Sequence, residues 1–166
     1  MSTKPQIMIG ADHRGFMLKE QLEAWLIELG YQVTDCGSHA YVTDDDYPTM
    51  AAAVGSAVVL GDASANLSAQ PGSDFRLGIL LCGSSIGVTI AANKINGVRA
   101  GSGFVIEEVV HGRAADDINI LTLAADHTTL EQAKSLVSAF VNTPFDHSDR
   151  SIRRLAAVQN LERTQA

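Results

Sequence analysis

The amino-acid sequence predicts a single α/β domain, a Rossmann-like, doubly wound sheet of five parallel strands with flanking helices and a C-terminal helix. Short apolar runs alternate with segments of helical periodicity along the chain, which is typical of βα units and a parallel sheet. The 166 residues suffice for one domain with a sizeable core, and a hydrophobic fraction of 46% excludes a disordered chain. With no internal repeat in the sequence, we expect residues 1–166 to form that one domain.

Five short apolar runs are the expected strands, at residues 6–10, 31–35, 76–82, 98–102 and 118–123. Helices are expected at residues 18–29, 48–60, 86–95, 104–115, 130–140 and 150–162. Gly30 suits the C-terminal cap of the first helix, and Pro48 suits the first turn of the second. Residues 61–74 are rich in small and turn-forming residues, so we expect a surface loop there.

Composition excludes several classes of protein. A formal net charge of -7 without a basic cluster argues against nucleic acid as a partner, and no apolar stretch is long enough to span a membrane. Residues 1–6 lack the apolar core of a signal peptide, so we expect a cytoplasmic protein. Two cysteines do not make a disulfide framework, no Cys/His spacing matches a zinc site, and no Gly-x-Gly-x-x-Gly follows a strand. Neither a metal nor a cofactor is therefore expected.

Cys82 ends the third expected strand and precedes a turn of small residues, Gly83 to Gly87, which leads into a helical pattern. Amides of such a turn can hold an anion, and a helix N-terminus favours the reactive thiolate. Most free cysteines are nevertheless small buried hydrophobes. From the sequence around Cys82 alone, a buried core thiol and a functional thiol are equally good interpretations. Cys36 has no such features, so we interpret it as a structural thiol.

Two other groups carry chemistry at the expected edge of the sheet or close to it. Asp12 and His13 directly follow the first strand, where ligands of parallel sheets bind, although Asp also caps helices well. Arg150 and Arg154 lie one helical turn apart and can clamp a phosphate, although for the pair alone a solvated basic stripe is the simpler explanation.

In order along the chain, these segments resemble the type B ribose-5-phosphate isomerases, a family that also contains the galactose-6-phosphate isomerase subunits. The resemblance runs from residue 6 to about residue 160. It rests on Gly10-Ala11-Asp12-His13-Arg14-Gly15, Asp46-Tyr47-Pro48, Cys82-Gly83-Ser84-Ser85-Ile86-Gly87, Ile90-Ala91-Ala92-Asn93-Lys94 and Arg150-x-x-x-Arg154.

The resemblance implies a cofactor-free aldose–ketose isomerase, an intramolecular oxidoreductase that acts on a phosphosugar, with ribose 5-phosphate and ribulose 5-phosphate as the default pair. It also implies a homodimer or tetramer with active sites at the subunit interface. Cys82 is then the base that moves a proton between C1 and C2 through a cis-enediolate, and Ser84 with the amides of the turn holds the enediolate oxygens.

Further roles follow from the same resemblance. Asp12 binds sugar hydroxyls and is a candidate proton shuttle. Tyr47 lines the pocket. The other expected substrate and phosphate contacts are His13, Gly83, Ser85, Gly87, Asp116, Arg150 and Arg154.

Four departures from the family pattern bear on the substrate. Ala115-Asp116-Asp117 stands where the family usually has His-Asn-Asp, so the ring-opening histidine is an alanine. Asp126 falls in the segment where a further arginine is usual, and Ser85 adds a side chain to a turn that usually reads Cys-Gly-Thr-Gly. The expected loop at residues 61–74 is also longer than usual.

Without an acid–base group, ring opening slows by roughly 10²–10⁴-fold. His111, four residues earlier on the same helix face, is one candidate replacement. A second reading is an erythrose/erythrulose 4-phosphate isomerase, because a tetrose 4-phosphate cannot close a furanose. A third is a non-catalytic sugar-phosphate-binding homologue.

Overall fold

The computed structural model describes residues 4–61 and 75–164. A five-stranded sheet with strand order β2-β1-β3-β5-β4 lies at its centre, and every strand pair is parallel. The strands are β1 (Gln6–Ala11), β2 (Val33–Asp35), β3 (Arg76–Cys82), β4 (Ala100–Ser102) and β5 (Ile120–Ala124). The helices are α1 (Phe16–Glu28), α2 (Tyr47–Gly61), α3 (Ile86–Ala92), α4 (Ile106–Asp116), α5 (Leu130–Asn142) and α6 (Asp149–Thr164).

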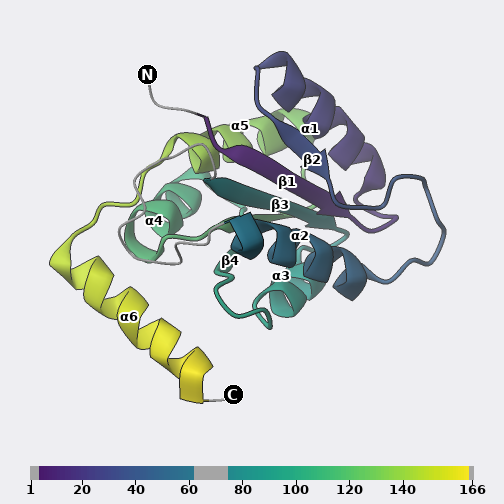
Figure 1. Ribbon diagram of the computed structural model, residues 1–166. Helices are drawn as coiled ribbons and strands as arrows, with labels where there is room; N and C mark the ends of the chain where they lie inside the picture. The colour runs from purple at the N-terminus through teal and green to yellow at the C-terminus, as the bar shows by residue number, and fades with distance from the viewer. Residues whose placement is uncertain (1–3, 62–74, 165–166) are drawn as a thin grey trace.

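Helices cover both faces of the sheet (Figure 1), and the core is correspondingly double. Alternate residues of each strand point to opposite faces. On one face the strands pack against α1, α4 and α5, and on the other against α2 and α3. The predicted fold class is confirmed, since a doubly wound parallel sheet requires crossovers on both faces.

The order in which the chain forms its strands determines where a ligand-binding crevice lies. From β1 the chain crosses through α1 to β2 on one side, and then returns through α2 to β3 on the other side of β1. The strand order therefore reverses at β1, and the carboxyl ends of β1 and β3 border the crevice where ligands of such sheets bind. Asp12 follows β1 and Cys82 ends β3, so both residues lie at this crevice.

Several predicted boundaries were wrong because local caps end the elements early. The strand predicted from residue 31 begins at Val33, since Tyr31 N donates to Leu26 O (3.0 Å) and closes the end of α1. The helix predicted to residue 95 ends at Ala92, after which the amides of Lys94 and Ile95 bond three residues back in a tighter turn.

The strand predicted from residue 98 begins at Ala100, because Val98 N donates to Ile95 O (3.0 Å) in the preceding turn. The helix predicted from residue 104 begins at Ile106, after the extended Val105. The strand predicted at residues 118–123 runs from Ile120 to Ala124, since Ile118 N donates to Gly112 O (3.1 Å) at the end of α4. The predicted loop at 61–74 falls, beyond Gly61, outside the described residues.

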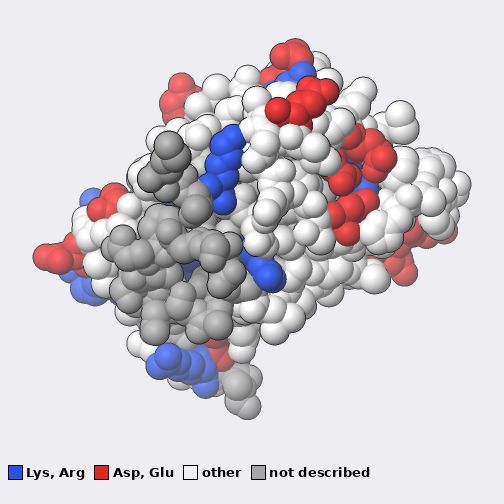
Figure 2. Space-filling model, turned by 45° about the horizontal axis from the view of Figure 1, so that its top comes forward, with Lys and Arg blue, Asp and Glu red and all other residues white. Residues whose placement is uncertain are grey.

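The C-terminal helix α6 lies along one side of the domain (Figure 1), and Gly97 N donates to Glu162 Oε1 (2.9 Å) near its end. Asp146 N donates to Ala114 O (2.9 Å), which ties the segment before α6 to the last turns of α4. No helix within residues 4–61 and 75–164 combines the length and the apolar character needed to cross a membrane. Acidic side chains gather at the top and at the right of the face in Figure 2, in keeping with the net charge of -7.

Candidate active site

Asp12 lies in the turn that joins β1 to α1. Its Oδ1 accepts hydrogen bonds from the amides of Arg14 (3.0 Å) and Gly15 (3.1 Å), and only 6% of the residue is exposed. Asp12 N donates to Leu81 O (3.2 Å), so the carboxylate stands one residue away from Cys82 across the strand pair. A Cβ on Gly15 would lie 2.6 Å from Leu81 Cβ, which explains why the turn needs glycine at this point.

Asp45 holds His13 in place. One carboxylate oxygen, Oδ1, accepts from His13 N (2.7 Å) and lies 2.9 Å from His13 Nδ1. Its other oxygen, Oδ2, is buried and has no hydrogen-bond partner among the described residues. The acidic run before α2 was the only sequence signal for Asp45, and its three aspartates could not be told apart there.

Cys82 is 4% exposed and its side chain packs with Met8, Leu80 and Val88 in the core between the sheet and α2 and α3. Its carbonyl accepts from Ala125 N (2.8 Å), which joins the end of β3 to the turn after β5. A thiol that ends a central strand beside Asp12, largely shielded from water, is placed to act on a ligand that fills the crevice.

The turn after Cys82 is tightly covered on two sides. The guanidinium of Arg14 lies on Gly83, where a Cβ would be 2.4 Å from Arg14 Cζ, and the same guanidinium pairs with Asp126. The ring of Tyr47 lies on Gly87, where a Cβ would be 2.8 Å from Tyr47 Cζ. Both glycines therefore permit close approach. Arg14 and Asp126 were not predicted as parts of the site.

The two serines of the turn differ in position. Ser84 is exposed, so its side chain is accessible to a ligand in the crevice. Ser85 is fully buried, and its hydroxyl donates to Ser102 Oγ (3.2 Å) on β4 rather than facing solvent. The structure thus brings together Asp12, His13, Tyr47, Cys82, Gly83, Ser84, Ser85 and Gly87, with the Ser85 side chain directed inward.

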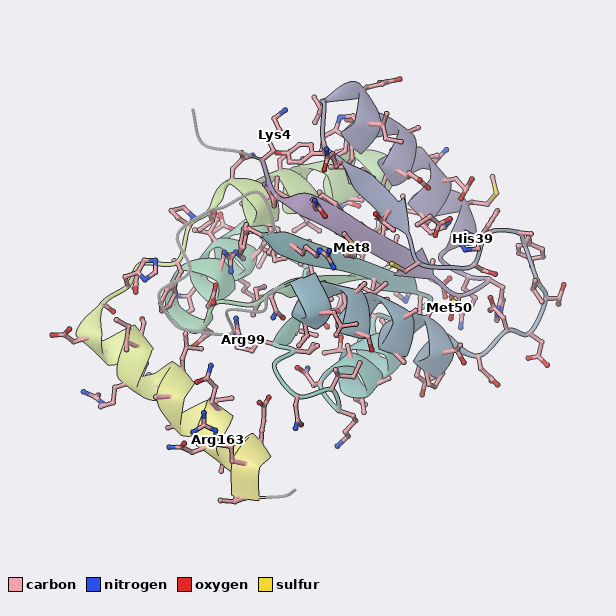
Figure 3. All side chains as sticks on the ribbon, viewed as in Figure 1. Lys4, Met8, His39, Met50, Arg99 and Arg163 are labelled. Carbon is pink, nitrogen blue, oxygen red and sulfur yellow. The ribbon has the colours of Figure 1, made fainter. Side chains whose placement is uncertain are left out.

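The remaining predicted residues lie at the other end of the sheet. Asp116 ends α4, just before the amino end of β5, whereas Cys82 is aligned with the carboxyl end of β5 at Ala124. Asp116 and Arg154 line a cavity of about 530 Å³ together with Lys94 and Arg99. Figure 3 shows Arg99 on the side of the body that faces α6, the helix that carries Arg163 near its end. Arg150 lies on the first turn of the same helix.

His111 is on α4 and is exposed, two residues from each of the buried positions Val109 and Arg113. Its side chain therefore points away from the sheet of its own chain, and Ala115 lies one turn further from the crevice. Within one chain, neither residue stands beside Cys82.

A separate charged cluster supports the edge of the crevice. Lys19 is fully buried on α1, and its Nζ lies 2.5 Å from Asp35 Oδ2 and 2.8 Å from Glu20 Oε1. Burial alone would lower the pKa of Lys19, but hydrogen bonds to Asp35 and Glu20 raise it. Burial raises the pKa of nearby Glu23. Carboxylate oxygens of Glu20, Glu23 and Asp35 lie within 4.8 Å of one another, with the Lys19 ammonium as their counter-ion.

Comparisons with known proteins agree with this geometry. The Ribose/Galactose Isomerase family matches residues 7–158. Ribose-5-phosphate isomerase B of Mycolicibacterium paratuberculosis is 35% identical over 159 residues, which cover 96% of this chain and 92% of that protein. The type B ribose 5-phosphate isomerase of Trypanosoma cruzi superposes with a TM-score of 0.86 at 29% identity, covering 99% of this chain and 100% of that chain.

The same fold carries a bound sugar phosphate in a solved relative. The ribose-5-phosphate isomerase B of Mycoplasma genitalium with bound ribulose-5-phosphate superposes with a TM-score of 0.79 at 30% identity, covering 95% of this chain and 96% of that chain. On the family match and these near full-length relatives, the chain belongs to the Ribose/Galactose Isomerase family.

Proposed function

We propose that this protein is an aldose–ketose isomerase that interconverts ribose 5-phosphate and ribulose 5-phosphate. The observation that carries the proposal is the convergence of Asp12, His13 and Cys82 at one crevice in a chain whose relatives bear that activity in their names. The residues offer a base, hydroxyl contacts and an anion site. The chain is expected to need no metal or cofactor, because the enolisation uses only proton transfers.

In the proposed reaction, the Cys82 thiolate removes the C2 proton of the open aldehyde, and the electron pair moves through the C1–C2 bond to O1. The resulting cis-enediolate is held by Ser84 and amides of the turn. A proton passes from O2 to O1, with Asp12 as the proposed shuttle, and the Cys82 thiol returns its proton to C1. The net change moves the carbonyl from C1 to C2.

The phosphate is proposed to bind to His13 and to positive charge near the turn. Asp45 fixes the His13 ring through Nδ1, which leaves Nε2 for the ligand. The Arg14 guanidinium, held over Gly83 by Asp126, adds positive charge at the same edge, where the resemblance calls for a further arginine. A thiol base works only when reduced, so we place the enzyme in the cytoplasm.

We further propose a homodimer or larger assembly in which each active site is completed by a second copy. Asp116, Arg150 and Arg154 lie at the opposite end of the sheet from Cys82, so one chain cannot bring them to its own crevice. The exposed apolar side chains of Ile86 and Ile90 begin directly after the turn, and Phe104, Val105 and Ile106 are also exposed. Exposed apolar groups next to the site are typical of an interface.

Subunit complementation tests this assembly. Cys82→Ser and Arg154→Ala are each expected to be inactive, but after mixing with subunit exchange the mixed dimers contain one intact site. About a quarter of wild-type activity is expected from a random mixture of dimers. If the mixture stays inactive while native mass spectrometry shows mixed dimers, Arg154 acts in the same chain as Cys82 and the shared site is wrong.

The absence of the ring-opening histidine favours a second candidate, isomerisation of erythrose 4-phosphate and erythrulose 4-phosphate. Ala115 occupies that position, and a tetrose 4-phosphate has no ring to open. Initial rates with ribose 5-phosphate and with the tetrose decide between them. Turnover of neither sugar, together with a raised melting temperature in their presence, would instead identify a non-catalytic binding protein.

A further inference from the structure

Ser85 has an unusual backbone for a residue with a side chain. Its φ of 65° and ψ of -26° lie in the left-handed region, a conformation that is costly for a residue with a Cβ. The residue is also fully buried, directly behind Ser84 and Cys82. A serine is retained here only if its hydroxyl offsets that cost.

Three other hydroxyl groups, of Thr89, Ser102 and Thr122, form a hydrogen-bonded ring with Ser85, and each of them is buried or half-buried. Ser85 Oγ donates to Ser102 Oγ (3.2 Å), and Ser102 Oγ lies 3.2 Å from Thr122 Oγ1. Thr122 Oγ1 lies 2.6 Å from Thr89 Oγ1, which donates to the Ser85 carbonyl oxygen (2.8 Å). The hydrogen-bonded ring therefore begins at the side chain of Ser85 and ends at its main chain.

The proton count makes this direction self-consistent. Each hydroxyl has one proton to donate, and the order Ser85, Ser102, Thr122, Thr89 uses every proton once. In the alternative order Ser102 donates directly to Thr89 (3.0 Å), and Thr122 donates to Thr89 or to Ser102, because a hydroxyl oxygen accepts two hydrogen bonds. Both orders keep Ser85 Oγ as donor and Ser85 O as acceptor.

The ring connects the turn to three other elements. Ser102 is on β4, Thr122 is on β5, and Thr89 is on α3. Because a peptide unit is planar, fixing the Ser85 carbonyl also fixes the direction of the following amide. The hydroxyl of Ser85 fixes the other side of the same residue. The ring thus ties the turn that presents Ser84 beside Cys82 to β5, the neighbour of β3, and to the edge strand β4.

We propose that Ser85 is a positioning residue for isomerisation, and that the ring of Ser85, Thr89, Ser102 and Thr122 holds the turn in the conformation that binds the enediolate. This inference rests on the proposed isomerase function. It replaces the expectation that the Ser85 side chain touches the substrate. Loss of the hydroxyl of Ser85, Ser102 or Thr89, which both orders require, loosens the turn and lowers kcat more than it changes KM, because the enediolate needs the fixed turn more than the ground-state sugar does.

Thr89 offers the cleanest pair of variants, because its hydroxyl donates to the Ser85 carbonyl oxygen in both orders and the residue lies on α3, outside the turn. Thr89→Val keeps the shape and removes the hydroxyl, whereas Thr89→Ser keeps the hydroxyl and removes a methyl group. We expect kcat to fall about 10–100-fold in Thr89→Val with KM little changed, as for other misplacements of catalytic groups. Thr89→Ser is expected to retain most of kcat although it loses packing, so that activity and melting temperature rank the two variants differently.

Ser85→Gly separates the hydroxyl from the backbone strain. Glycine adopts the left-handed conformation freely, so the variant would be as active as the wild type or more active if Ser85 only filled space. The proposal predicts that Ser85→Gly and Ser85→Ala both lose kcat. Wild-type kcat in Ser85→Gly and Thr89→Val would overturn it.

A binding measurement keeps this test separate from the isomerase proposal. A phosphorylated sugar hydroxamate mimics the planar enediolate, and its affinity is measured by calorimetry. The proposal predicts at least about tenfold weaker binding to Thr89→Val than to the wild type or to Thr89→Ser. If the wild type turns over neither sugar, the isomerase proposal fails, and equal hydroxamate affinities in all variants would overturn the role of the ring as well.

Discussion

Asp45 Oδ1 accepts the backbone N–H of His13 at 2.7 Å and lies 2.9 Å from Nδ1 of the same histidine, so one carboxylate oxygen holds both the main chain and the ring. The two residues are 32 positions apart in the sequence. A carboxylate on Nδ1 sets the tautomer and the orientation of the ring, which is how such pairs prepare the other nitrogen for a ligand.

We therefore expect Asp45→Asn to weaken substrate binding. The amide can still accept the His13 N–H, but it no longer carries the charge that supports the ring, so KM for a sugar phosphate rises about 10-fold or more with a smaller change in kcat. Asp44→Asn is the matched control, because Asp44 has a φ of 68° that asparagine tolerates. Equal KM values for the two variants would show that Asp45 does not support substrate binding through His13.

The Lys19–Asp35 pair is expected to make the free energy of unfolding depend on pH, with lower stability in acid. Burial alone would raise the pKa of Asp35, but hydrogen bonds from Lys19 and Gly37 outweigh it and lower the pKa. A carboxylate with a lowered pKa in the folded state contributes stability above its unfolded pKa of about 3.9, and this contribution disappears as the pH falls through the folded pKa. Urea unfolding from pH 7 to pH 2 measures it.

In that series Asp35→Asn is expected to lower the free energy of unfolding at pH 7, and the difference from the wild type should vanish at the acid end. Lys19→Met, which leaves the carboxylate without its buried partner, should cost about 3 kcal/mol at pH 7. Glu131→Gln breaks the exposed Lys134–Glu131 pair and should change stability by less than about 0.5 kcal/mol. If the free energies of unfolding of the wild type and Asp35→Asn differ by the same amount at every pH, the Lys19–Asp35 pair is not the source of the pH dependence.

A histidine introduced at position 115 tests whether the substrate is ribose 5-phosphate or erythrose 4-phosphate. If ring opening limits the enzyme, Ala115→His raises the rate with ribose 5-phosphate by up to about 10²-fold and leaves the rate with erythrose 4-phosphate unchanged. Ala114→His, one position away on α4, is the control for adding an imidazole to this helix.

His111→Ala completes that comparison. A large loss confined to ribose 5-phosphate would assign ring opening to His111 of a second copy, since the side chain points away from the sheet of its own chain. Unchanged rates with both sugars in His111→Ala would discard His111 as a replacement.

The sequence sufficed for the elements and for half of the site. Periodicity predicted five strands and six helices, and residues at the ends of strands 1 and 3 were expected to meet because parallel strands share a carboxyl edge. The order that inserts β5 between β3 and β4 could not be predicted, since it depends on pairings between distant segments. The roles of Asp45 and Arg14 in the candidate site were not predicted for the same reason, because each depends on one long-range side-chain contact.

Ser85 shows a different limit. Its place in a glycine-containing turn suggested a substrate contact, but the direction of a side chain from a turn depends on φ, which the sequence pattern does not reveal. Asp116 and Arg154 show a third limit, because they lie at the opposite end of the sheet from Cys82, and only the proposed assembly would bring them to the active site of a second copy.

The central claim, that Cys82 is the proton-transferring base, is tested most directly by isomerisation in deuterated water. The wild type is expected to convert ribose 5-phosphate to ribulose 5-phosphate with deuterium at C1, detected by NMR. Cys82→Ser fills nearly the same buried volume but should lower both conversion and deuterium incorporation by about 10²–10⁴-fold, whereas Cys36→Ser should match the wild type. Deuterium incorporation by Cys82→Ser at the wild-type rate would contradict the claim.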